Sequence, residues 1–482
     1  MEQKAGAQIS TKAFIQSALI LLVLMIAAGF LTRVIPAGSY ERYDFEGRTL
    51  IDPASYQVID RPAYPIWRWF TAPVEVLWGD DNLIIITIIV FILLVSGAFA
   101  VLEKSGILTT ILAKIVRRFR ARRYTLLLVV SLFFMLLGGF FGLLEEIIPL
   151  VPLLIALSYS LGWDALVGLG MSVLATNIGF SAAITNPFTI GVAQKLAGLP
   201  LFSGALLRLP VFIVFYAVLA WFLLTYARRI DRDPSSSLLY KEDQAKNTPH
   251  KHFDLETAGS DPRVGRAALV FGGFIVLILA VLLAGPFVPA IADYTLPLVG
   301  LLFFIGGLVS GVVSGSGWRL IGSALKEGVL GLAPGIPLIL MAASTKHIVS
   351  SGKVIDTLLH SGSNLLEGAS PLAAVLIMFL LALVVEFFVA SAGAKAVLLM
   401  PILLPLADLV GVTRQLTVSA YCFGDGFTNL AYPTNAILLI SLGLASVSYG
   451  RWMRFTAKLW LVIFPLVVFF LWIGSLIRFG PF

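Results

Sequence analysis

Long apolar runs separated by shorter polar segments make up most of this chain. Such runs recur along its whole length, from about residues 14–30 to about residues 459–477. A helix of about 20 apolar residues spans the ~30 Å hydrocarbon core of a bilayer. The chain is 59% hydrophobic and only 13% charged, whereas soluble domains carry about 25% charged residues. The pattern therefore predicts an all-α polytopic membrane protein that is embedded in the lipid bilayer.

Interruptions in the apolar pattern divide the chain into units. The first run is longer than the apolar core of a typical signal peptide and lacks a clear cleavage site, so we expect a retained helix. The predicted units are a first transmembrane helix at 1–31, an external loop at 32–81, a first repeat at 82–226, a cytoplasmic linker at 227–266, two connecting spans at 267–313 and a second repeat at 314–482. Within the repeats we expect hairpins at 124–161 and 371–410, broken helices at 165–195 and 414–440, and a last span at 459–477.

The placement of arginine indicates which polar segments face the cytoplasm. Five arginines and no acidic residue lie between Arg117 and Arg123, and short cytoplasmic loops are enriched in basic residues. The linker likewise begins with Arg228-Arg229, whereas segment 32–81 has no lysine, more acidic than basic residues and many aromatic residues. Counting crossings between these landmarks predicts a cytoplasmic N-terminus and an external C-terminus.

The two halves of the chain resemble each other in sequence. Matching segments recur at a nearly constant separation: Phe140-Phe141 with Phe387-Phe388, Thr185-Asn186 with Thr434-Asn435, and residues 196–204 with residues 442–450. By the same count of crossings, the first hairpin enters the membrane from the cytoplasmic face and the second from the external face. The repeats are then inverted, an arrangement typical of secondary transporters.

Each repeat contains a helix that is interrupted by glycine, asparagine, threonine and proline. Lipid supplies no hydrogen bonds, so a broken backbone is tolerated only inside protein or beside water. The exposed half-helix ends can hold a carboxylate through N–H groups and a cation through carbonyls. A proline kink that only packs is the alternative, but two breaks at matching places favour a binding site. The candidate substrate- and ion-binding residues are Asn177, Thr185, Asn186, Asp425, Thr428, Asn429, Thr434 and Asn435.

Ionisable residues interrupt the apolar stretches near these breaks. Besides Asp425 they are Glu145, Glu146, Glu386 and Lys395. A charge at the bilayer centre costs about 2.5–3.5 kcal/mol or more, so such residues usually face a cavity and pair with a solute, an ion or one another. For Lys395, a structural ion pair with Glu386 or Asp425 is the alternative to a functional role. Four acids and one lysine suit an amino acid better than a dianion.

Other function classes find little support in the sequence. It contains no P-loop, no zinc-ligand spacing and no nucleophile–base pair. We therefore expect neither a membrane-embedded enzyme nor a cofactor or structural metal, and only Na⁺ or H⁺ as a coupling ion. A channel usually needs a pore ring from symmetric subunits, which inverted repeats do not provide. The net charge of +7 is not gathered in a soluble basic domain, so we expect no nucleic-acid partner.

Several segments resemble the DcuC/YfcC family of bacterial carriers, within the ion transporter superfamily. The resemblance lies in IPAG at 35–38, TNPFTIG at 185–191, GLPLFSG at 198–204, FGDGFTN at 423–429 and YPT at 432–434. It implies a scaffold domain and a transport domain with two opposed hairpins, in a homodimer that moves solute by an elevator-type shift across the bacterial inner membrane. The implied solute is a C4-dicarboxylate or an amino acid, the latter by arginine/ornithine-type exchange. The Ser-Asn-Thr hairpin tip of better known dicarboxylate carriers is absent, so their binding residues do not transfer.

Overall fold

The computed structural model describes residues 11–45, 48–79, 82–144, 147–245, 261–284, 288, 294–366, 368–389 and 391–480. Over these ranges the chain is almost entirely helical, and by length and composition eight helical segments could cross a membrane. This confirms the helical, multi-pass part of the predicted fold class.

The polar segment after the first helix departs from an all-α description. In it, β1 (Gly38–Ser39) pairs antiparallel with β4 (Gln57–Val58), and β2 (Arg42–Phe45) pairs antiparallel with β3 (Arg48–Ile51). The short helix α2 (Arg68–Glu75) follows and packs on α16 (Ile336–Ser351). Glu75 of α2 is held by hydrogen bonds from Arg68, Thr71 and His347. Burial alone would raise the pKa of its carboxyl, but these hydrogen bonds outweigh burial and lower the pKa to about 2.

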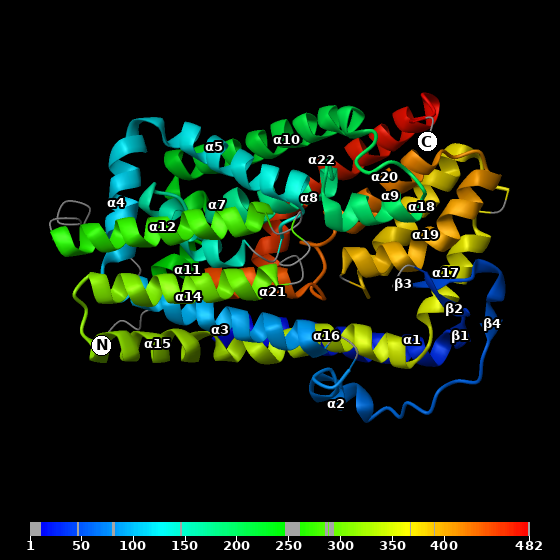
Figure 1. Cartoon of the computed structure of the whole chain (residues 1–482), viewed down its shortest axis with the longest axis horizontal. Helices are drawn as coiled ribbons and strands as arrows, with labels where there is room; N and C mark the ends of the chain where they lie inside the picture. The colour runs from blue at the N-terminus through cyan, green and yellow to red at the C-terminus, as the bar shows by residue number, and fades with distance from the viewer. Residues whose placement is uncertain are drawn as a thin grey trace.

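One group of long helices packs side by side in the middle and lower parts of Figure 1. Its members are α1 (Thr11–Val34), α3 (Asn82–Lys104), α12 (Pro262–Ala284), α14 (Thr295–Val313), α15 (Trp318–Leu332) and α16. The contacts of α3 with α14 and α15, of α12 with α14, and of α1 with α16 hold the group together. Ser96 of α3 donates to the carbonyl of Gly328 on α15 at 2.8 Å, and Lys104 pairs with Glu327 at 2.6 Å. These helices thus form one layer beside the rest of the chain.

The remaining helices form a second group, which covers the segments predicted as hairpins and as broken helices. In the first half these are α4 (Ile107–Phe119), α5 (Arg123–Leu136), α6 (Val151–Ser160), α7 (Ala165–Leu169), α8 (Ala175–Ala182), α9 (Val192–Leu196) and α10 (Ala205–Arg232). In the second half they are α17 (Ile355–Asn364), α18 (Pro371–Glu386), α19 (Ala392–Leu409), α20 (Arg414–Phe427), α21 (Ala436–Ala445) and α22 (Tyr449–Leu476).

Two helices are longer than the apolar pattern alone indicated. Helix α10 continues to Arg232, beyond the expected end at residue 226, and α22 begins at Tyr449 instead of residue 459. A polar side chain supports the extension of α22, because Ser448 caps it by accepting from the N–H of Arg451. Within the expected linker, α11 (Tyr240–Ala245) is also helical. A hydropathy pattern misses such ends because charged residues remain helical where they can reach water.

The hairpins start from opposite ends of the molecule. The ends of the first meet, because Arg123 at the start of α5 donates to the carbonyl of Leu161 just after α6. In Figure 1, α4, which leads into α5, lies at the left, whereas α18, α19 and the β-strands lie at the right with the end of α22.

Glycines let the broken helices approach the hairpins and each other closely. A side chain at Gly179 of α8 would collide with the backbone of Met135, and one at Gly138 with the backbone of Thr176. Where α8 crosses α20, a Cβ at Gly426 would lie 2.5 Å from the Cα of Ser181. The two broken helices therefore touch backbone to backbone near the centre of this group.

Candidate functional site

The first broken helix is interrupted between α8 and α9. Its segments are α7, the π-helical turn η5 (Gly170–Leu174), α8, the π-helical turn η6 (Pro187–Gly191) and α9. Ala183 ends α8 in the left-handed conformation, with φ 44°. Asn186 then caps the next half, because its side-chain oxygen accepts from the N–H of Phe188 at 2.9 Å and of Thr189 at 3.2 Å. Pro187 follows at a position where a missing N–H costs nothing.

Thr185 ties this break to the first hairpin. Its hydroxyl donates to the carbonyl of Phe140 at 2.9 Å, and the N–H of Ile184 donates to the carbonyl of Gly139 at the same distance. At the end of the π-helical turn η3 (Leu137–Phe141), Gly142 has φ 71°, and a Cβ there would collide with the side chain of Asn186. The hairpin and the break are therefore one packed unit.

The second broken helix is built in the same way. Asn435 caps α21 by accepting from the N–H of Ile437 at 2.9 Å and of Leu438 at 3.4 Å. The amide nitrogen of Asn435 donates to the side-chain oxygen of Asn429 at 3.0 Å. Tyr432 ties this break to the second hairpin through a 3.1 Å hydrogen bond to the carbonyl of Leu383. Asn186 and Asn435, which match in sequence, thus each cap the helical segment that follows the break.

Glu386, Lys395 and Asp425 form a buried cluster of charges, called the triad below. The ammonium of Lys395 contacts the carboxylate of Glu386 and lies 2.6 Å from Oδ1 of Asp425. All three side chains are buried, with at most 1% of each exposed. Because Glu386 ends α18, Lys395 lies in the first turn of α19 and Asp425 belongs to α20, the triad joins both arms of the second hairpin to the second broken helix.

The triad is unbalanced in charge. When all three groups are ionised, its two carboxylates exceed its one ammonium by one negative charge. Apart from Lys395, no donor among the described residues hydrogen-bonds the carboxylate oxygens. Burying charges costs several kcal/mol per ion unless they are paired and hydrogen-bonded. The arrangement can therefore be completed by a proton, a metal cation or the cationic group of a solute.

The other predicted residues lie outside the triad and differ in burial and in hydrogen bonding. Asn177 is fully buried, and within the described ranges neither its amide oxygen nor its amide nitrogen has a hydrogen-bond partner. Thr428 donates to the carbonyl of Gly424 at 3.1 Å, and Thr434 is half-buried beside Asn435. Glu145 and Glu146 lie outside the described residues. An unsatisfied buried amide costs about 1–3 kcal/mol, so Asn177 is well suited to meet a polar ligand or water.

Arg208 is a functional candidate that the sequence analysis missed. This buried arginine of α10 donates to the carbonyls of Ala183 and Ile184, at 2.9 Å each, and to that of Ser203 at 2.9 Å. It supplies a positive charge at the C-terminal end of α8, where the helix dipole is negative. Its position within an apolar run is the same signal that singled out Glu386 and Lys395, and could have found it.

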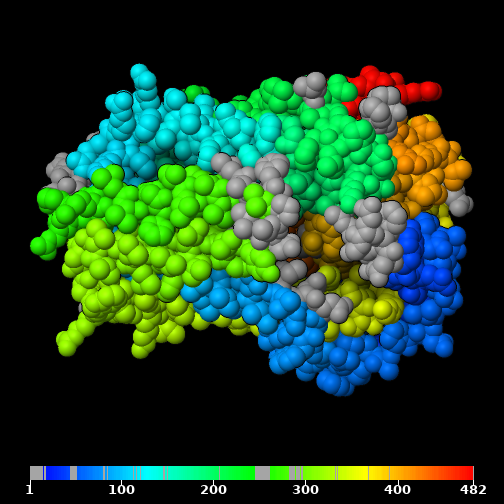
Figure 2. Space-filling view, viewed as in Figure 1, coloured from blue at the N-terminus to red at the C-terminus, as the bar shows by residue number. Residues whose placement is uncertain are grey.

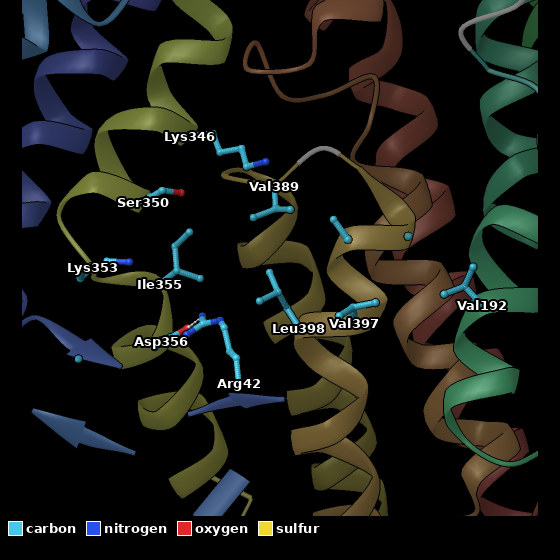
Figure 3. Close-up of a pocket in the computed structure, with 13 residues that line it drawn as sticks. Arg42, Val192, Lys346, Ser350, Lys353, Ile355, Asp356, Val389, Val397 and Leu398 are labelled. Carbon is cyan, nitrogen blue, oxygen red and sulfur yellow. Dashed lines mark hydrogen bonds and ion pairs between the residues drawn. The ribbon is translucent and has the colours of Figure 1, made fainter. Parts of the chain in front are cut away.

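A cavity of about 550 Å³ is lined in part by the start of α19, the helix that also carries Lys395 of the triad. Its wall combines the start of α19 with the end of α16, the start of α17 and the first β-strands (Figure 3). Figure 2 shows this face of the molecule hollowed between the green, orange and yellow segments. Among the described residues, none of those predicted from the sequence lines it.

Comparison with known proteins decides the family. Residues 14–476 match the family described as DcuC, the C4-dicarboxylate anaerobic carriers. The chain belongs to the DcuC family. A DcuC-family chain with eight candidate spans is a multi-pass membrane transporter and not an enzyme.

Two relatives of this DcuC-family member share 30% and 27% of their residues with it over the aligned regions. One is YfcC of Escherichia coli (strain K12), named as a candidate basic amino acid antiporter; it is 30% identical over 91% of this chain and 92% of its own length. Another, an uncharacterized protein of Haemophilus influenzae (strain ATCC 51907 / DSM 11121 / KW20 / Rd), is 27% identical over 81% of this chain and 74% of its own. Among solved structures, the YdaH transporter of Alcanivorax borkumensis matches with a TM-score of 0.43 and 19% identity, over 97% of this chain and 100% of that chain.

Proposed function

We propose that this DcuC-family protein is a secondary-active transporter of a small carboxylate-bearing solute. The observation that carries the proposal is the buried triad, which joins the second hairpin to the second broken helix and has one negative charge in excess. In a membrane protein, such a buried ionisable cluster usually marks an ion or substrate pathway. The bilayer midplane is the expected position of the site in carriers with broken helices.

The excess charge gives the triad a cation-binding role. If the solute has no cationic group, the triad binds the coupling ion, H⁺ or Na⁺, and no other cofactor is needed. If the solute is an amino acid, its ammonium group can take the same place. In either case, binding neutralises a charge that is otherwise costly to bury, so movement of the hairpin is coupled to occupancy.

The capped breaks supply the complementary anion-binding groups. Each second half-helix begins at an asparagine cap, Asn186 or Asn435, and a helix N-terminus attracts carboxylates. The unpaired amide of Asn177 adds a neutral donor and acceptor. Together with Thr185, Thr428, Asn429 and Thr434, these groups are suited to bind a small carboxylate.

The solute is a C4-dicarboxylate or an amino acid, and the second class has specific support. The family description names C4-dicarboxylates. The triad, however, holds two carboxylates and one lysine, and the Escherichia coli relative is named for basic amino acids. Exchange of cationic amino acids of the arginine/ornithine type is therefore the second candidate function.

An elevator with inverted repeats is the architecture that we propose. In it, α1, α3, α12 and α14–α16 act as scaffold, and the hairpins with the broken helices act as the moving domain of a homodimer. Support comes from the matching asparagine caps and from the opposite ends at which the hairpins begin. The arginine-rich end of α4 is then cytoplasmic and the β-strand end external, in a bacterial inner membrane.

Solute counterflow tests the proposed function. Proteoliposomes that contain the purified chain are loaded with unlabelled L-arginine or succinate and diluted into a trace of the same labelled solute. A carrier gives a transient, saturable accumulation of label above equilibrium. Entry of label that neither saturates nor overshoots, in a preparation that binds these solutes, would contradict a carrier and favour a channel.

A further inference from the structure

Helix α2 carries an apolar stripe that faces away from the rest of the protein. Its members are Trp67, Phe70, Val74 and Trp78, and each is more than half exposed. Their spacing of three or four residues places them on one face of a helix, and backbone hydrogen bonds continue the helical turns of α2 to both tryptophans. A contiguous stripe of large apolar side chains, unlike single exposed ones, marks a surface that meets a partner or a membrane.

The opposite face of α2 is buried against α1 and α16. Trp69 and Ala72 belong to a buried cluster that also contains residues of these two helices. A Cβ at Gly29 of α1 would collide with the ring of Trp69. Just before α2, the carbonyl of Tyr64 accepts from Arg33 of α1 at 2.7 Å. Figure 1 shows α2 at the lower edge of the molecule, below α16. The packing therefore fixes the direction in which the stripe points.

A polar face of α2 lies beside the stripe. Arg68 pairs with Glu75 at 2.7 Å, and Thr71 donates to the same carboxylate at 2.6 Å. His347 of α16 also lies 3.3 Å from this carboxylate. The charges of α2 thus gather on one face, next to an uncharged apolar one. Helices that are divided in this way lie in the plane of a membrane surface, with the apolar side buried about 5–10 Å into the boundary between headgroups and acyl chains.

The stripe is continuous with the apolar surfaces of two membrane helices. On α1, Val23 and Phe30 are exposed. Helix α3 begins four residues after Trp78, and its first turns expose Leu83 and Val90. In a multi-pass membrane protein, such exposed apolar faces meet lipid. Because α2 directly precedes a membrane span, it lies where the lipid chains give way to headgroups, and tryptophan is enriched at this level.

We propose that α2 is an interfacial anchor, whose stripe of Trp67, Phe70, Val74 and Trp78 inserts into the surface of the lipid bilayer. The anchor holds α1 and α16 at a fixed depth in the membrane. Lipid is the occupant, and not a second copy of this chain, because the stripe extends the lipid-facing surfaces of α1 and α3 and carries a tryptophan at each end. The proposal does not depend on the transported solute or on the triad.

Quenching of a fluorescent label tests the anchor in the full-length protein. Single cysteines replace Phe70 or Val74 on the stripe, or Thr71 on the polar face, in a Cys422→Ala background, and each is labelled with bimane. The proteins are reconstituted into phosphatidylcholine bilayers, with lipid brominated on the acyl chains as the membrane quencher and iodide as the aqueous quencher. The labels at Phe70 and Val74 should lose more emission to brominated lipid than to iodide. The label at Thr71, one residue away and also exposed, is the matched control and should lose more to iodide.

A charge placed in the stripe gives a second readout. Phe70→Asp should shift the quenching of a label at Val74 from brominated lipid to iodide, because a carboxylate is costly to bury among acyl chains. Thr71→Asp adds the same charge on the polar face and should leave that quenching unchanged. The cysteine variants alone decide the matter if Phe70→Asp does not fold.

Two results would overturn the anchor. Stronger quenching of the labels at Phe70 and Val74 by iodide than by brominated lipid would place the stripe in water. Protection of both labels from both quenchers would show that protein covers the stripe, as a second copy of the chain would.

Discussion

Among single residues, Lys395 has the most demanding environment. It is fully buried between two carboxylates, and the contact with either one alone would leave the other unpaired. Removal of one partner from a buried ion pair typically costs about 3–5 kcal/mol, because the remaining charge is uncompensated. The triad is therefore a strongly coupled unit, and its members should not act additively.

A double-variant comparison tests this coupling. Lys395→Gln leaves two buried carboxylates and should destabilise the protein by about 3–5 kcal/mol. Lys395→Gln combined with Asp425→Asn removes one charge of each sign and should be the more stable of the two proteins. Thermal unfolding in detergent measures both, with Asp425→Asn alone completing the cycle. Additive losses would mean that the three groups do not share one buried site.

Asn435 offers a second test at the residue scale. Asn435→Ala removes the cap of α21, which should cost about 0.5–2 kcal/mol, and should also abolish uptake. Asn435→Ser keeps an oxygen that can cap the helix but loses the amide that meets Asn429. The serine variant should therefore melt like the wild type, yet transport about tenfold more slowly. Wild-type transport by the serine variant would reduce Asn435 to a structural cap.

Sequence reasoning found the residues of the triad but could not say how they pair. The cost of a charge in an apolar stretch singles out Glu386, Lys395 and Asp425 without any structure. Whether Lys395 meets one carboxylate or two depends on how α18, α19 and α20 pack, which the sequence does not state. The charge of Arg208 within an apolar run could have singled it out in the same way, but its partners, the backbone carbonyls of Ala183, Ile184 and Ser203, carry no sequence signal.

At the scale of elements, the breaks were foreseeable and their detailed shape was not. Asparagine followed by proline, or by a fresh apolar run, locates the start of each second half-helix. The π-helical turns η3, η5 and η6 were not foreseen, because a shift from i−4 to i−5 hydrogen bonding depends on neighbouring packing. All three belong to the first repeat or its hairpin, so the two repeats differ locally despite their matching caps.

The crossing of the two broken helices gives an element-scale prediction. Gly426→Ala would force a Cβ to within 2.5 Å of the Cα of Ser181, and overpacking of this kind typically costs about 1–3 kcal/mol. The variant should melt at a lower temperature and lose transport. Gly322→Ala on α15 is the control, because a Cβ there meets open space and alanine favours a helix by about 1 kcal/mol. Equal stability of the two variants would show that the helices do not touch at Gly426.

For the molecule as a whole, the apolar pattern predicts the membrane helices but not the β-strands of the polar segment after the first helix. The strands at 38–58 form in a segment whose short apolar stretches give no clear prediction, and β1 packs against α17, far along the chain. Arg42 of β2 reaches Asp356 of α17 at 2.8 Å, a contact between residues far apart in the sequence. A hydropathy pattern along the chain cannot predict such pairs, because it does not state which distant residues meet in the fold.

The proposed inversion of the repeats makes a prediction about sidedness. Single cysteines at Ser160, at the end of the first hairpin, and at Leu409, at the end of the second, are introduced into a Cys422→Ala background. Impermeant thiol reagents should label them from opposite faces of oriented vesicles, with Ser160→Cys reacting from the cytoplasmic side. Labelling of both from the same face would end the inverted arrangement.

The most direct test of the central claim is driven uptake by Asp425→Asn. This change keeps the shape of the side chain and removes the excess negative charge of the triad. Net uptake driven by an ion gradient and solute exchange are measured side by side in proteoliposomes, for the variant and the wild type. Net driven uptake should be lost in the variant. Exchange should persist if Asp425 binds only the coupling ion, and should be lost too if Asp425 binds the solute. Net uptake in Asp425→Asn with the rate, pH dependence and Na⁺ dependence of the wild type would contradict the account.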